Sequence, residues 1–159
     1  MLVAKYPDYK ILMLPQTYNN RDYQSDVHFF EELKIYTGES RLEIVDDKWG
    51  SDIQQAIISG AEYLVGARYH SIVFAINNAT PFLALGYEEK ILGLLKSLSE
   101  PTQFVDITGA FKDSRSFGST LSSIERAINA PITASIVNRD TAKKIARSSF
   151  SEFLKKIEL

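Results

Sequence analysis

The first segment that could do chemistry is a short run in which an arginine and a histidine stand two positions apart. Residues 63–68 (YLVGAR) are typical of a buried strand, and residues 69–78 are apolar nearly all round, which predicts a buried helix. The N–H groups that begin a helix can bind an anion. Arg68 adds a guanidinium suited to phosphate or carboxylate, and His70 adds an imidazole, which can transfer a proton. This junction could therefore hold an anion and transfer a proton.

The same two side chains also have a purely structural interpretation. Arg68 could form an ion pair with Asp46 or Asp47, which end the preceding predicted strand. His70 could simply cap the helix. The residue types leave both interpretations open.

Two other strand exits carry polar side chains. Lys90 opens a predicted helix, where a cation opposes the helix dipole unless an anion lies nearby. That anion could be a bound ligand, or it could be Glu88 or Glu89. Gln16 and Thr17 follow the first predicted strand and could donate hydrogen bonds to a ligand.

Short apolar segments alternate with amphipathic ones along the whole chain. The expected strands are 10–17, 42–47, 63–68, 81–87 and 104–108; the expected helices are 22–36, one beginning at Ser51, 69–78, 90–98, 119–129 and 140–157, with a loop at 109–118. This order predicts βαβ units. We therefore expect one Rossmann-like α/β domain over residues 1–159, with an open, mostly parallel five-stranded sheet and helices on both faces. Ligands bind such sheets at the carboxyl ends of the strands.

Composition excludes several classes of function. The 159 residues carry 18 Lys+Arg and 20 Asp+Glu, without the basic excess expected of a nucleic-acid binder. There is no cysteine and there are only two histidines, so we expect no disulfide and no metal site. The longest apolar run, 72–76, is far shorter than the roughly 20 residues of a membrane span. We expect a cytoplasmic protein.

The stretch 66–95 is similar to the signature of the polysaccharide pyruvyl transferase family. The matching positions form an R-x-H element, an alanine in the following helix, a proline and a Y-x-x-K element: Arg68, His70, Ala75, Pro81, Tyr87 and Lys90. The resemblance covers about residues 10–108. One departure is Ala79-Thr80 before the proline, where a glycine often occurs.

The resemblance implies a fold and a partner domain. Members of the family resemble two-domain GT-B glycosyltransferases and are typically twice this length. The chain is therefore expected to be the C-terminal domain of a longer enzyme, with a missing N-terminal domain supplied elsewhere. Turnover by this domain alone is not implied.

The resemblance also implies a reaction. A pyruvyl group would pass from phosphoenolpyruvate to two hydroxyls of a sugar in an exopolysaccharide or cell-wall polymer, forming a ketal, with no cofactor beyond that donor. An acceptor linked to a membrane lipid would hold the protein at the inner face of the membrane. The implied catalytic residues are His70, as general acid or base, and Arg68, which holds the anions of the donor; Lys90 would support the leaving phosphate. The implied substrate-binding residues are Arg68, Tyr69, Ser71, Lys90, Gln16 and Tyr87.

Two other functions are compatible with the same pattern. A GT-B glycosyltransferase dependent on a nucleotide sugar would bind its diphosphate at similar strand ends, and titration with the two kinds of donor would separate the two enzymes. A non-catalytic Rossmann-like binding module would instead pair Arg68 and Lys90 with carboxylates of the chain itself.

Overall fold

The computed structural model describes residues 2–17, 25–45, 49–87, 89–98, 103–130 and 144. The chain divides into two compact units, Met1–Gln54 and Gln55–Leu159. Every strand pair among the described residues is parallel, and a helix follows each strand, which confirms the α/β class. The five expected strands are present, but their described pairs form a two-stranded and a three-stranded sheet instead of one sheet of five. The single domain over 1–159 stays a prediction.

The first unit is built around one parallel strand pair. It contains α1 (Leu2–Lys5), β1 (Ile11–Met13), α2 (Asp26–Thr37) and β2 (Leu42–Ile44). The register pairs Ile11 with Leu42. The helix α2 begins where the Ser25 hydroxyl accepts a hydrogen bond from the Val27 N–H, and it ends at Gly38, whose φ of 62° suits glycine.

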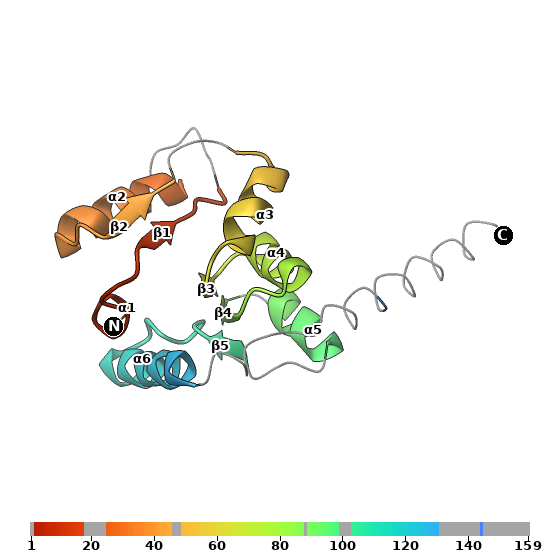
Figure 1. Ribbon diagram of the computed structural model, residues 1–159. Helices are drawn as coiled ribbons and strands as arrows, with labels where there is room; N and C mark the ends of the chain where they lie inside the picture. The colour runs from red at the N-terminus through yellow and green to blue at the C-terminus, as the bar shows by residue number, and fades with distance from the viewer. Residues whose placement is uncertain are drawn as a thin grey trace. The chain divides into compact units, whose positions relative to one another are not determined.

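The second unit holds the three-stranded sheet. After α3 (Ser51–Ser59), its elements are β3 (Leu64–Gly66), α4 (Tyr69–Asn78), β4 (Phe82–Gly86), α5 (Glu89–Ser97), β5 (Phe104–Asp106) and α6 (Ser114–Asn129). The strand order is β3-β4-β5. Figure 1 shows α4 and α5 together on one side of these strands and α6 on the other. Helices thus cover both faces of this sheet.

The core of the second unit explains why its central strand is apolar throughout. Phe82, Leu83 and Ala84 of β4 are buried, because β4 lies between β3 and β5 and packs against α4 and α5. The helix α4 follows the sequence-based bounds of 69–78, and five of its residues are buried. This packing fixes the ends of β3 and β4, from which the candidate site residues project.

One predicted loop is wrong over part of its length. The sequence predicts a loop for residues 114–118, but they form the first turns of α6. The Asp113 side chain accepts a hydrogen bond from the Ser116 N–H and so caps this helix. The predicted helix at 140–157 lies outside the described residues, apart from Lys144, which is helical.

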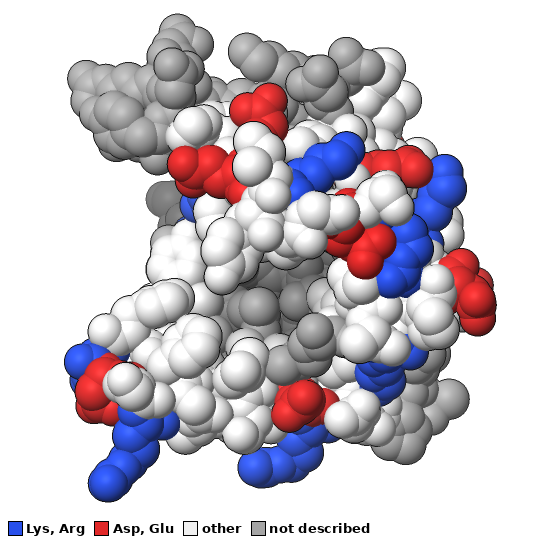
Figure 2. Space-filling view, turned by 90° about the vertical axis from the view of Figure 1, so that its left-hand side faces the viewer, with Lys and Arg blue, Asp and Glu red and all other residues white. Residues whose placement is uncertain are grey.

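Charges of both signs are mixed on one face of the molecule. On the face drawn in Figure 2, lysines and arginines are interspersed with aspartates and glutamates. An anion site on such a surface depends on individually placed cations, not on a broad positive field. Among the residues that the structure describes, no helix is both long and apolar enough to cross a membrane.

Candidate functional site

The exit of β3 brings a helix start close to the strand end. Arg68 is the extended N-cap residue of α4, with φ of −104° and ψ of 138°. The buried Ser71 hydroxyl donates a hydrogen bond of 2.7 Å to the Arg68 carbonyl oxygen. The N–H groups of residues 69–71 lie in the first turn, where no acceptor exists within the helix. The backbone of this turn therefore has the chemistry of an anion site.

Glycine is required where the strand meets this turn. A Cβ atom on Gly66 would lie 2.7 Å from the Ser71 Oγ and 2.9 Å from the Ile72 Cδ1. Because both neighbours are buried, neither has open space to move into. The close approach of β3 to α4 thus depends on Gly66, and it sets the position of Arg68.

The exit of β4 reaches the same place from the neighbouring strand. Gly66 pairs with Ala84 in the parallel register, so the two strands end at one edge of the sheet. The Arg68 Nη1 atom donates a hydrogen bond of 3.1 Å to the Tyr87 hydroxyl. Arg68 of the R-x-H element and Tyr87 of the Y-x-x-K element, 19 positions apart, are therefore in direct contact.

A second contact joins the same two exits. The Lys90 Nζ atom lies 5.9 Å from the centre of the Tyr69 ring, within the range of a cation–π interaction. Lys90 is exposed in the first turn of α5, which begins at Glu89. The structure thus gathers Arg68, Tyr69, Tyr87 and Lys90 at one sheet edge.

His70 lies beside this group and is exposed. Its ring centre is 6.0 Å from that of Tyr69, edge to face, and 6.3 Å from that of Phe74. Aromatic contacts on two sides limit the orientations of the imidazole. An exposed but oriented imidazole is suited to exchanging a proton with a bound ligand.

Gln16 lies in the first unit and is engaged within it. Its Nε2 donates hydrogen bonds to the Gln54 Oε1 at 2.9 Å and to the Pro15 carbonyl at 3.4 Å. Its N–H donates to the Asp26 carboxylate at 3.0 Å. Its share in a site with Arg68 stays a prediction.

The carboxylates offered as alternative partners of the two cations are only partly described. Asp46, Asp47 and Glu88 lie outside the described residues. The structural interpretation of Arg68 and Lys90 therefore stays open beside the functional one. No group of three or more metal-ligating side chains occurs within the described ranges.

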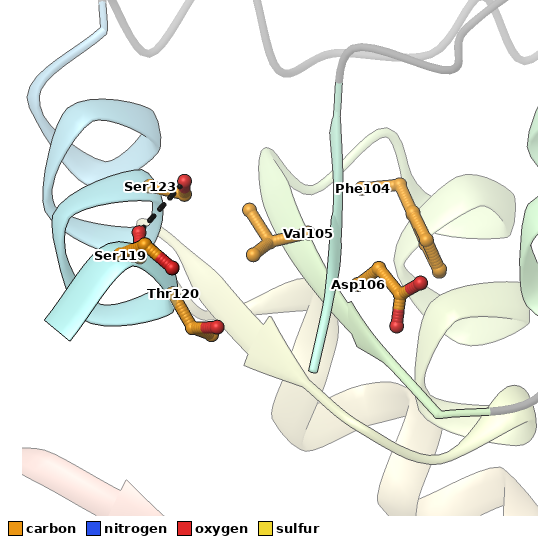
Figure 3. Close-up of a pocket in the computed structure, with 6 residues that line it drawn as sticks. All are labelled: Phe104, Val105, Asp106, Ser119, Thr120 and Ser123. Atoms are coloured by element: carbon orange, nitrogen blue, oxygen red, sulfur yellow. Dashed lines mark hydrogen bonds between the residues drawn. The ribbon is translucent and has the colours of Figure 1, made fainter. Parts of the chain in front are cut away.

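A pocket of about 300 Å³ lies between β5 and α6, and the sequence pattern does not predict it. It is lined by Phe104, Val105, Asp106, Ser119, Thr120 and Ser123. Val105 faces the helix, whereas Phe104 and Asp106 lie on the far side of the strand (Figure 3). The sequence feature that could have indicated this pocket is Asp106 at the exit of the fifth strand. In the structure, hydrogen bonds from Thr108 hold the pKa of Asp106 below its usual range.

Sequence similarity relates the chain to a known family and to a bacterial biosynthesis protein. The profile described as polysaccharide pyruvyl transferase matches residues 1–89, more than half of the chain, including Arg68, His70 and Tyr87 and ending one position before Lys90. The amylovoran biosynthesis protein AmsJ of Erwinia amylovora is 30% identical over 67 residues, which are 42% of this chain and 16% of that relative. No solved structure matches the chain significantly.

Proposed function

Because the chain belongs to the polysaccharide pyruvyl transferase family, we propose that its β3 and β4 exits bind phosphoenolpyruvate in a ketal-forming pyruvyl transferase of exopolysaccharide synthesis. One observation carries the proposal. Two cations, Arg68 and Lys90, stand at neighbouring strand exits beside an exposed imidazole and the start of a helix.

The donor explains why two cations are needed. Phosphoenolpyruvate carries a phosphate and a carboxylate whose phosphorus and carbon are three bonds apart, and both must be held in one orientation. In the proposal, Arg68 and the N–H groups of residues 69–71 bind these anions, and Lys90 supports the phosphate as it leaves. The Ser71 hydroxyl is already bonded to the Arg68 carbonyl, so Ser71 contributes its N–H.

His70 supplies the proton transfers. One sugar hydroxyl adds to C2 of the enol phosphate and loses its proton, while C3 gains a proton and becomes a methyl group. The C2–O bond to phosphate then breaks, and the second hydroxyl adds to C2 and loses its proton, giving the ketal and inorganic phosphate. The imidazole could protonate C3 or accept a hydroxyl proton, and either role typically contributes about 10²–10⁴-fold.

The other substrate and the other half of the site belong to the larger protein. The match spans only 16% of the curated relative's length, so the complete activity is proposed for a two-domain GT-B-like enzyme. Its acceptor would be a saccharide, linked to a lipid at the inner face of the membrane. Gln16 and Tyr87 would take part in substrate binding.

Calorimetric titration of the full-length protein tests this proposal. Phosphoenolpyruvate and a nucleotide sugar are titrated separately under the same conditions. We expect binding of phosphoenolpyruvate and none of the nucleotide sugar. Binding of the nucleotide sugar alone would favour a glycosyltransferase, and binding of neither would favour a non-catalytic module.

A further inference from the structure

We propose that Tyr69 and Tyr87 act as positioning residues in a crossed arrangement, each holding the cation that the other strand exit supplies. Tyr87 follows β4 and contacts Arg68 from the β3 exit, whereas Tyr69 follows β3 and contacts Lys90 from the β4 exit. This inference rests on the proposed function, because the cations are held for the anionic donor.

The two contacts are chemically different. Arg68 donates to the phenol oxygen of Tyr87, so the contact requires the hydroxyl. Lys90 lies over the ring of Tyr69, so that contact requires the aromatic face and not the hydroxyl.

Both contacts act on flexible side chains. Arginine and lysine lose much rotamer freedom when they are fixed on a ligand. A cation that is already held in place loses less conformational entropy when the donor binds, so the affinity for the donor rises. The tyrosines would therefore change donor affinity and KM more than kcat.

Because the two contacts differ in chemistry, replacement by phenylalanine should weaken donor binding at Tyr87 but be tolerated at Tyr69. Tyr87→Phe removes the acceptor of the Arg68 bond and should weaken phosphoenolpyruvate binding about ten-fold. Tyr69→Leu should weaken it about three-fold, and Tyr69→Phe should restore most of that loss because the ring remains. Tyr36→Phe is the matched control, since Tyr36 is 90% exposed on α2.

A double-mutant cycle separates positioning from a general structural role. In an Arg68→Ala background, Tyr87→Phe should have little further effect on binding, because its partner is absent. If the two effects multiply instead, Tyr87 does not act through Arg68 and the inference is wrong. Equal binding by wild type and Tyr87→Phe would also overturn it.

A measurement without ligand keeps this inference distinct from the proposed function. The side-chain NMR signals of Arg68 should exchange with water more slowly in the full-length wild type than in Tyr87→Phe. If that difference is seen but phosphoenolpyruvate does not bind, the proposed function fails, whereas the contact by which Tyr87 holds Arg68 stands. If phosphoenolpyruvate binds but the NMR signals are the same, only the crossed arrangement fails.

Discussion

The Arg68 guanidinium donates a hydrogen bond to the Tyr87 hydroxyl across 3.1 Å. This bond joins two sequence elements that lie at the ends of adjacent parallel strands, β3 and β4. Because ligands of open α/β sheets bind at these ends, the pair marks the edge where a donor would lie. The contact also explains why an R-x-H and a Y-x-x-K element can serve one site.

His70→Ala should abolish pyruvyl transfer by the full-length enzyme without unfolding it. The imidazole is exposed, so its removal leaves no buried cavity, whereas it removes the proposed proton-transfer group. Phosphate release from phosphoenolpyruvate should fall at least about 100-fold. His28→Ala is the control: it replaces the other of the chain's two histidines, which lies on α2, and it should retain activity. Near-normal turnover by His70→Ala would refute the role assigned to His70.

Ala79→Gly should stabilise the protein. Ala79 ends α4 at φ of 54° and ψ of 31°, a left-handed conformation that costs an alanine about 1–2 kcal/mol. Glycine removes this strain from the folded state, but it also increases the conformational entropy of the unfolded chain, which offsets part of the gain. The free energy of unfolding should therefore rise by about 0.5–1 kcal/mol. Urea denaturation measures the change.

A matched glycine substitution checks this explanation. Ala56 lies within α3, where φ is negative and glycine lowers stability by about 1 kcal/mol. Opposite signs for Ala56→Gly and Ala79→Gly are expected. Destabilisation by both would mean that the backbone of Ala79 is not left-handed in solution.

Gly86→Ala should destabilise the second unit. A Cβ atom on Gly86 would overlap the ring of Phe104 on the neighbouring strand β5. Overpacking of this kind typically costs about 1–3 kcal/mol in the free energy of unfolding. Since Tyr87 is the next residue, donor affinity should fall as well.

Shortening the opposing side chain should relieve this strain. In Phe104→Leu the ring that blocks the new methyl group is absent, so Gly86→Ala should cost less there than in the wild type. Thermal unfolding of the four proteins gives the comparison. An equal cost in both backgrounds would show that the two residues do not meet.

Lowering the pH should weaken the cap of α6 and so reduce the free energy of unfolding. Ser116 donates its N–H and its hydroxyl to Asp113, and these bonds hold the pKa of Asp113 below its ordinary value. A lowered folded-state pKa stabilises the fold above the unfolded pKa, and this contribution is lost as the pH drops through the folded pKa. The free energy of unfolding should therefore decrease below about pH 4.

Asp113→Asn isolates this contribution. Asparagine can still cap the helix but does not titrate. Urea denaturation at several pH values should show a shallower decrease for Asp113→Asn than for the wild type. Identical slopes would mean that Asp113 does not contribute to the pH dependence.

Periodicity predicted the elements well where apolar segments were continuous. The bounds of α4 agree with the predicted 69–78, because a helix with five buried apolar or small residues leaves a clear pattern after a short apolar strand. The start of α6 was missed because its first turns are rich in serine and glycine, and the capping role of Asp113 was not recognised. The polar contact of Arg68 with Tyr87 depends on register and side-chain rotamer, which the sequence does not encode locally.

The binding of phosphoenolpyruvate by the full-length protein and by Arg68→Lys tests the central claim most directly. Lysine keeps the charge but lacks the planar guanidinium, which can bind an anion through two parallel hydrogen bonds. We predict that the wild type binds phosphoenolpyruvate and that Arg68→Lys binds it about ten-fold more weakly, with its fold intact. An unchanged dissociation constant in Arg68→Lys would contradict the account.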